Sequence, residues 1–261
     1  MSAPAPPCLT RWVGGVSSGP AGVLHVAAVW ERSGGDYETL RVGEGAPRSL
    51  SDAVVLSGAR ARADAIVTTG RILRDEPELV HASIAPPDMT AELAAWRHAI
   101  GLDAPPWVAV LTASGELPLD HPAFAAAERL VFFTGPAGAA RLRSMPGRPP
   151  HAEIVEARLP GAATLVEHLR SVRGARSILV EAGASTARTL YEGAGLIDEL
   201  WLSVCLAPDL APDDVVGPFV DRRAIEATLG PAVHAERHDD GGLEWATLVH
   251  RRAARRDASG S

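Results

Sequence analysis

The stretch LVEAGAST, residues 179–186, contains the junction that decides the fold: a short apolar run ends in an acid, and small residues then lead into a helical pattern. Small side chains let the backbone come close to a ligand, and the free N–H groups at the start of a helix suit a pyrophosphate. The stretch lacks the complete G-x-G-x-x-G fingerprint of dinucleotide-binding folds. A plain capped helix, with Ser185 or Thr186 as its N-cap and Glu181 in solvent, explains the same residues equally well.

The same alternation of strand and helix patterns runs along the chain. Short runs rich in Val, Ile or Leu predict eight strands, at residues 23–30, 65–69, 107–112, 129–134, 153–157, 177–181, 199–206 and 243–250. Helical patterns lie between them, at residues 49–63, 90–100, 136–144, 162–172 and 185–193. This alternation predicts an α/β fold with a largely parallel sheet covered by helices on both faces. Only the short helical stretch 221–229 separates the last two strands, so we expect an antiparallel edge there.

The composition is typical of one globular domain. Hydrophobic residues make up 46% of the 261 residues and charged residues 22%, which suffices for the core of a single α/β domain. We expect this domain to cover residues 15–250, between flexible stretches at 1–14 and 251–261. No apolar run approaches the roughly 18 residues of a membrane span. The first residues lack a signal-peptide pattern, so a cytoplasmic location is expected.

Charge and residue usage exclude several classes of protein. The net charge of −7 argues against nucleic acid as a partner. All 25 basic residues are Arg, and the sequence contains no Lys, Asn or Gln, which excludes a Schiff-base lysine, a Walker-type lysine and an amide-lined oxyanion hole. Cys8 and Cys205 lie far apart without metal-ligand spacing, so neither a disulfide framework nor a metal site is expected.

Two further strand ends carry polar residues. VTTGR, residues 67–71, offers the hydroxyls of Thr68 and Thr69 beside Gly70, which suits a phosphate or a carboxamide, although taken alone the stretch is more often a simple turn with solvated threonines. RDEPEL, residues 74–79, could hold a polyhydroxyl substrate, but an isolated charge run is more often a solvated surface. Ligands of open α/β sheets bind beyond the carboxyl ends of the strands, so these corners are the candidate site.

Taken in order, these segments resemble one family. RADAIVTTG at 62–70 and DEPEL at 75–79 are similar to the D-A-I … D-D-P-x-L block of the reductase domain of riboflavin biosynthesis, the C-terminal domain of a bifunctional deaminase-reductase. VAVLT at 108–112, ELPLD at 116–120 and VFFT at 131–134 resemble the next two strands and an L-P-L-D turn. The strongest match is ILVEAG at 178–183 with GLIDEL at 195–200, which resembles V-E-G-G … G-L-[I/V]-D-E-L.

The resemblance implies a dihydrofolate-reductase-like fold with a central, mostly parallel eight-stranded sheet. It also implies NADPH as hydride donor, a homodimer, and the reduction catalysed by 5-amino-6-(5-phosphoribosylamino)uracil reductase, in which an opened ribose receives the hydride. The fused deaminase is not expected, because its P-C-x-x-C zinc signature is absent. The implied NADPH-binding residues are Thr68, Thr69, Gly70, Thr112, Ser114, Thr134, Gly183, Ala184 and Ser185. Asp75 and Glu181 are the implied substrate-binding residues, and no catalytic residue is singled out.

Two departures from the family pattern indicate an altered substrate. The first strand ends in VWER, residues 29–32, where the family has S-x-D-G, and Glu78 replaces an arginine that meets the substrate phosphate. Besides an altered reductase, the sequence leaves open a catalytically silent relative that binds a nucleotide or acts as an interaction module. An unrelated α/β enzyme is a third reading.

Overall fold

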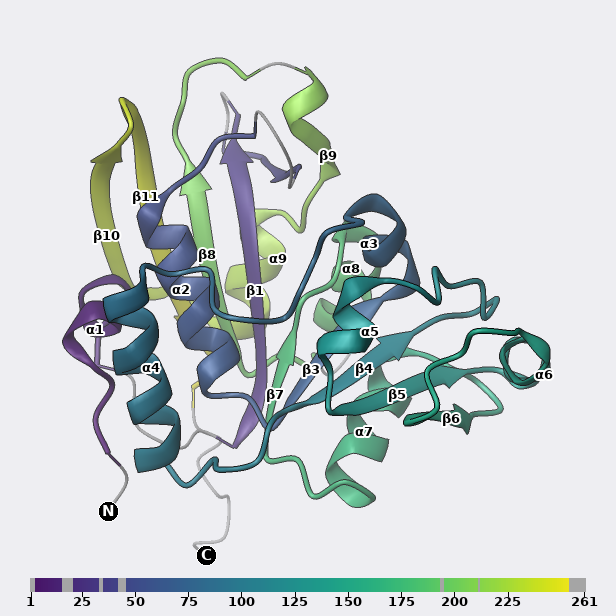
Figure 1. Cartoon of the computed structure of the whole chain (residues 1–261). Helices are drawn as coiled ribbons and strands as arrows, with labels where there is room; N and C mark the ends of the chain where they lie inside the picture. Colours follow the sequence, from purple (N-terminus) through teal and green to yellow (C-terminus); the bar gives the residue numbers. More distant parts are fainter. Residues whose placement is uncertain are drawn as a thin grey trace, which may run out of the picture.

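An eleven-stranded mixed sheet forms the centre of the protein (Figure 1). The computed structural model describes residues 3–15, 21–32, 35–41, 46–192, 195–210 and 212–253. The main path of the sheet runs β10-β11-β8-β1-β7-β3-β4-β5-β6, and β2 joins β1 to β9. The strands are β1 Gly22–Glu31, β2 Tyr37–Leu40, β3 Ala65–Thr69, β4 Trp107–Leu111, β5 Arg129–Thr134, β6 Ala152–Glu156, β7 Ser177–Val180, β8 Glu199–Cys205, β9 Val215–Pro218, β10 Ala232–Asp240 and β11 Leu243–Arg251.

The eight predicted strands are all present, each within one residue of its expected bounds. All six neighbouring pairs from β8 through β6 are parallel, whereas β11 runs antiparallel to β8, so the expected antiparallel edge is confirmed. The expected count of eight strands was wrong, because β2, β9 and β10 are additional. β2 and β9 are only four residues long, and β10 is a charged edge strand whose sequence lacks apolar alternation.

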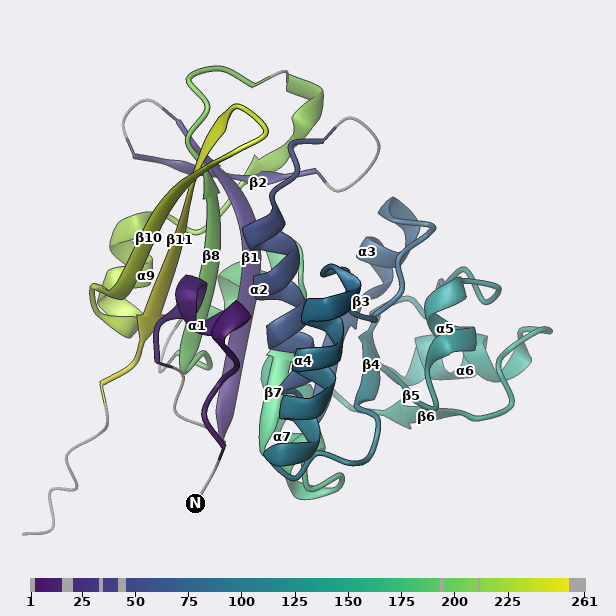
Figure 2. The same ribbon diagram turned by 60° about the vertical axis from the view of Figure 1, so that its left-hand side comes forward.

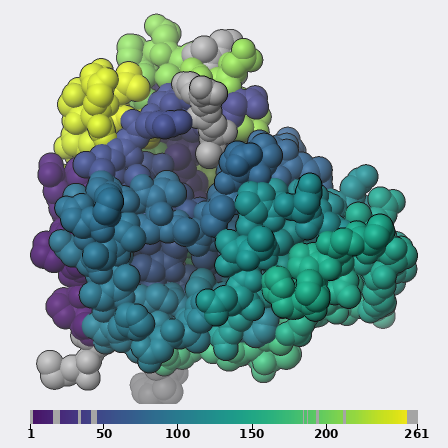
Figure 3. Space-filling model, in the orientation of Figure 1, coloured from purple at the N-terminus to yellow at the C-terminus, as the bar shows by residue number. Residues whose placement is uncertain are grey.

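Helices cover both faces of the sheet, as predicted. One face packs against α7 (Ala162–Ser171), α8 (Ala184–Tyr191) and α9 (Arg222–Leu229). The other face carries α1 (Pro7–Val13), α2 (Leu50–Ala61), α4 (Pro87–Ala99), α5 (Pro122–Ala126) and α6 (Pro136–Ser144). Figure 2 shows α2 and α4 side by side over the strands. The fold therefore has three layers, and the segment from α5 to β6 extends on the right of the space-filling view (Figure 3).

Two helix starts differ from the sequence-based expectation. α1 lies within the stretch 1–14, for which we expected no regular structure, and buries Leu9 and Trp12 in the core cluster shared with α2 and α4. α4 begins at Pro87 rather than at Thr90, because proline has the backbone angle of the first helical turn. The Thr90 hydroxyl instead donates a hydrogen bond to the Ala85 carbonyl, at 3.0 Å.

The register of the central strands brings the predicted corners together. β3 and β7 pair in parallel, with Val67 opposite Val180. The segments that follow them, at Gly70 and Gly183, consequently line one cleft, as the sequence predicted. Within the described residues, no helix is long and apolar enough to cross a membrane.

Candidate active site

A cleft of about 1060 Å³ opens where β7, β3 and β4 end. Its lining includes residues from β1, β2 and α2 as well as from the short helix α3 (Gly70–Asp75), α8 and the β9 segment. Pockets for small ligands span roughly 300–1,000 Å³. The cleft is therefore large enough for a dinucleotide and a second molecule together.

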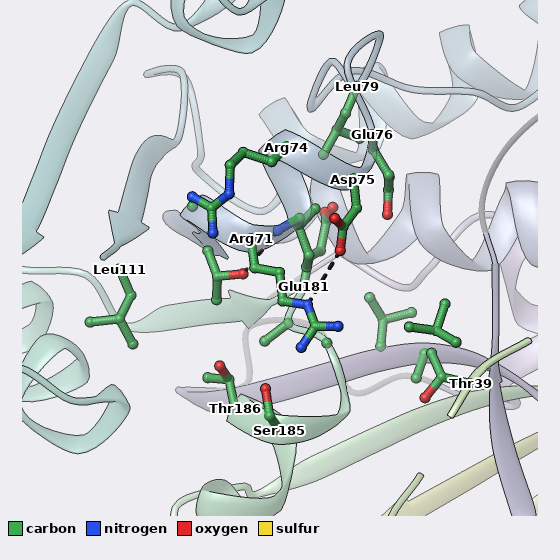
Figure 4. A pocket seen from close by; sticks show the side chains of 18 of the residues that line it. Thr39, Arg71, Arg74, Asp75, Glu76, Leu79, Leu111, Glu181, Ser185 and Thr186 are labelled. Atoms are coloured by element: carbon green, nitrogen blue, oxygen red, sulfur yellow. Dashed lines mark hydrogen bonds and ion pairs between the residues drawn. The ribbon is translucent and has the colours of Figure 1, made fainter. Parts of the chain in front are cut away.

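The nucleotide corner, as we name the Thr69–Gly70, Thr112–Ser114 and Gly183–Ser185 segments, forms one side of the cleft. The Thr69 hydroxyl caps α3 by accepting a hydrogen bond from the Ile72 amide, at 3.3 Å. Gly183 precedes α8, and a Cβ atom placed on it would meet nothing within 4 Å. The start of an eight-residue helix therefore faces open space, with Ser185 and Thr186 beside it (Figure 4).

Not every predicted cofactor-binding residue reaches this corner. Thr68 and Thr134 have fully buried side chains, and the Thr134 hydroxyl lies 3.5 Å from the Ala113 carbonyl. Thr68 and Thr69 are consecutive in β3, and successive strand side chains point to opposite faces of the sheet. The two hydroxyls therefore do not lie on the same face. Ala184 is the first residue of α8.

Glu181 is held by a buried ion pair across the cleft. Two Arg60 nitrogens, Nε and Nη2, each donate to one Glu181 carboxylate oxygen at 2.8 Å, and His81 Nδ1 lies 3.2 Å from Oε2. The Arg60 and Glu181 side chains are only 5% and 10% exposed. Burial opposes ionisation of Glu181, but Arg60 and His81 outweigh it and hold the pKa of this carboxyl far below its ordinary value. Glu181 is thus a fixed anion.

Glu76 has the opposite protonation behaviour. It follows α3 and lines the cleft near Asp75 and Leu79 (Figure 4). Burial raises the pKa of the Glu76 carboxyl to about 7, and the negative charge of Glu181 adds to this shift while Arg60 opposes it. Two carboxyl groups of one cleft, whose environments push their pKa values apart, are the usual arrangement for acid–base chemistry.

The other predicted substrate residue, Asp75, is more accessible. Its side chain is 56% exposed and lies 3.4 Å from Arg71, one helical turn earlier. Such an exposed pair is weak and can be exchanged for a ligand. Asp75 and Glu181 therefore line the same cleft but differ in availability, because only Asp75 is free of buried partners.

Asp52 and Arg60 of the cleft were not predicted from the sequence, whereas Glu76 lies in the predicted 74–79 segment but was not singled out there. Asp52 and Arg60 lie eight residues apart on α2, so both face the cleft together with Leu56. The four-residue spacing of Asp52, Leu56 and Arg60 indicates that they share one face of the helix. It does not show which residues lie opposite that face. The cleft lining contains five arginines and five carboxylates, and the described residues contain no group of three His, Cys, Asp or Glu that could hold a metal ion.

The sheet order and the cleft at its carboxyl edge define a dihydrofolate-reductase-like α/β protein. The chain belongs to the RibD C-terminal domain family, whose model matches residues 35–210. This confirms the resemblance stated from the sequence. No curated protein sequence matches the chain.

Solved structures show the same fold at low sequence identity. A pyrimidine reductase-like protein from Corynebacterium diphtheriae aligns with a TM-score of 0.64 and 15% identity, over 94% of this chain and 98% of that one. Acinetobacter baumannii RibD (form 2) aligns with a TM-score of 0.61 and 20% identity, over 91% of this chain but 59% of that one. The riboflavin biosynthesis reductase Rib7 of Saccharomyces cerevisiae has a TM-score of 0.51 and 15% identity, with 94% and 96% covered. The chain thus spans 59% of the length of the RibD protein.

Proposed function

We propose that this protein is an NADPH-dependent reductase that acts on a ribosylamino-pyrimidine and yields the ribitylamino compound. The observation that carries the proposal is the combination, in one cleft, of a nucleotide corner with two carboxyl groups of opposite protonation, Glu76 and Glu181. Reduction of a C=N bond requires a hydride at carbon and a proton at nitrogen. The cleft contains a group suited to each requirement.

The nucleotide corner fits a phosphorylated dinucleotide. Gly183 leaves open space at the start of α8, and Arg71 and Arg188 also line the cleft. Backbone N–H groups at a helix start bind pyrophosphate, and guanidinium groups bind phosphate oxygens in pairs. When bound, NADPH supplies the hydride and leaves as NADP⁺.

Glu76 is the proposed proton donor. A carboxyl group with a pKa of about 7 is close to half protonated at neutral pH, so it can deliver a proton and regain one from water. Glu181 remains ionised, and its carboxylate can accept hydrogen bonds from the hydroxyls of the opened ribose. Asp75, at the more exposed part of the cleft, is the second proposed hydroxyl acceptor.

The substrate phosphate is the part of the family reaction for which the cleft is least suited. Glu78 is exposed among the lining residues and adds negative charge where the family pattern has an arginine. Like charges at the rim weaken binding of a phosphate. We propose that a dephosphorylated substrate is turned over more efficiently than its 5-phosphate.

The proposal is tested by titrating NADPH fluorescence and then following NADPH oxidation at 340 nm with ribosylamino-pyrimidines. Glu76→Gln should lower kcat about 100-fold or more, since general acids contribute roughly 10²–10⁴, with the affinity for NADPH unchanged. In the wild type, kcat should fall as the pH rises through about 7, because the donor must be protonated, and Glu76→Gln should abolish this fall.

A matched control is Glu116→Gln, which removes an exposed glutamate that pairs with Arg141 at 3.6 Å outside the cleft. This variant should keep the wild-type rate and pH profile. NADPH binding without oxidation by any ribosylamino-pyrimidine would refute the proposed activity and support the silent nucleotide-binding alternative.

A further inference from the structure

Helix α8, whose first turn faces the cleft, is attached to the core at its last turn. Among its described side chains, only those of Leu190 and Tyr191 are buried. The side chains of Ser185 and Arg188 are exposed and line the cleft. Gly183, at the N-cap position, has no side chain with which to cap the first turn. The orientation of α8 therefore depends on what holds its last turn.

The last turn is held by a buried hydrogen bond to β1. The Tyr191 hydroxyl lies 2.8 Å from Nδ1 of His25, and both side chains are buried. The His25 ring also stacks on Phe219, with the ring centroids 5.6 Å apart and the planes inclined by 27°. His25 pairs in register with Val180, the last residue of β7. The hydrogen bond thus ties the end of α8 to the strand beside the one that leads into the helix.

Both members of this pair are neutral at neutral pH. Burial lowers the pKa of His25 to about 4, and the backbone of Ala182, just before α8, acts on the ring in the opposite direction. Burial likewise raises the pKa of Tyr191 far above its ordinary value. A buried neutral hydrogen bond has no water to replace a lost partner, so its removal leaves the other group unsatisfied.

The chain before α8 is fixed as firmly as its end. The Glu181 amide donates to the Val67 carbonyl at 2.8 Å, and the Glu181 carboxylate is held by Arg60. Only Ala182 and Gly183, two small residues, lie between this fixed point and the first turn of α8. Small residues allow the helix to change direction there, and the bond at Tyr191 opposes such a change.

We propose that His25 and Tyr191 are positioning residues for the dinucleotide, because their hydrogen bond holds α8 with its first N–H groups directed into the cleft. This inference rests on the proposed function, which assigns the pyrophosphate to that helix start. Neither residue is among the described residues that line the cleft. A helix that is held in place before the ligand arrives loses less conformational freedom on binding. The pair therefore raises the affinity for NADPH without touching it.

The test uses the two tyrosines of the chain, both of which are buried. Tyr191→Phe removes the hydroxyl that meets His25, and the dissociation constant of NADPH should rise about fivefold, the effect of one neutral hydrogen bond. Fluorescence titration measures this change. Hydrogen exchange of the backbone amides of residues 184–191 should be faster than in the wild type without NADPH. It should return to the wild-type rate at saturating NADPH, because the bound ligand then holds the helix.

The matched control is Tyr37→Phe, which removes a buried hydroxyl that accepts a hydrogen bond from Arg222 at 2.8 Å. This variant should leave the NADPH affinity and the exchange of residues 184–191 unchanged. His25→Asn retains a hydrogen-bonding group near the position of Nδ1, so it should bind NADPH more tightly than His25→Leu does. These two variants decide the question if Tyr191→Phe does not fold.

The outcomes separate this inference from the proposed function. If the wild type binds NADPH and Tyr191→Phe binds it equally well, the inference is overturned and the proposed function stands. Equal weakening in Tyr37→Phe and Tyr191→Phe would reveal a general loss of stability and would also overturn the inference. A wild type that does not bind NADPH would overturn both.

Discussion

The nucleotide corner and the α2 side of the cleft, formed by Asp52, Leu56 and Arg60, line the same cavity but are built differently. The corner consists of residues that directly follow three adjacent parallel strands, β7, β3 and β4. The α2 side also includes residues of β1 and β2, which come from separate parts of the sequence. A strand end followed by a helix start is encoded locally, whereas the α2 side of the cleft depends on how α2, β1 and β2 pack together.

The largest effect is expected at the Arg60–Glu181 pair, which joins the two regions. Arg60→Met should lower the free energy of unfolding by about 3–5 kcal/mol, because it leaves the Glu181 carboxylate buried without its cation. Urea denaturation at pH 7 measures the loss. The pair lowers the pKa of Glu181 relative to the unfolded chain, so its contribution is present above the unfolded pKa of about 4.3 and is lost as the pH falls through the folded value.

The control for this variant is Arg143→Met. Arg143 and Glu156 also form a 2.9 Å pair, but their side chains are 56% and 39% exposed. This change should cost less than about 1 kcal/mol. If Arg60→Met and Arg143→Met lowered the free energy of unfolding by the same amount, the buried pair would not be what holds the two regions of the cleft together.

A smaller effect is expected from Gly183→Val, which addresses the nucleotide corner alone. A side chain at residue 183 meets open space, and the backbone angles there, φ −63° and ψ 164°, suit any residue. The variant should fold with wild-type stability but bind NADPH about 10- to 100-fold more weakly, or about 1.4–2.8 kcal/mol, because the valine fills the space left for phosphate.

Fluorescence titration of NADPH measures this loss. The NADPH affinity of Gly183→Ala should lie between those of Gly183→Val and the wild type. Unaltered NADPH affinity in a folded Gly183→Val protein would show that the dinucleotide binds in another part of the cleft.

The smallest effect is expected from Glu78→Arg at the exposed rim. The added positive charge should raise kcat/KM for a 5-phosphorylated substrate about fivefold relative to the dephosphorylated compound, which corresponds to roughly 1 kcal/mol for a solvent-exposed charge pair. Sodium chloride at 0.5 M should remove most of the gain through screening. A gain that persists at high salt would mean that the side chain at position 78 meets the phosphate in a part of the cleft shielded from solvent.

The sequence predicted the fold more completely than the site. Apolar β-type runs with clear boundaries identified every strand from β3 to β8 and the strand pair that holds Gly70 and Gly183 together. β10 was not predicted because an edge strand needs no apolar face. α1 was not predicted because a helix of seven residues shows little periodicity.

For the site, local motifs indicated the corners but not the partners across the cleft. Glu181 was expected to meet substrate, yet its nearest cation, Arg60, lies 121 residues away in the sequence. Glu76 belongs to an acidic run that is compatible with a solvated loop, and its pKa is raised first by burial and then by the charges of Glu181 and Asp75. Such long-range desolvation and charge coupling cannot be read from the order of residues.

The position of β1 has a consequence for how the chain is made. Leu24 of β1 pairs with Leu179 of β7 on one side and with Glu199 of β8 on the other. When the ribosome has produced the chain as far as α4, β1 is therefore an apolar strand without either of its parallel neighbours. Long-range parallel pairing slows folding and leaves such strands open to aggregation. We therefore expect co-expression with a chaperone that binds exposed apolar strands to raise the yield of folded protein.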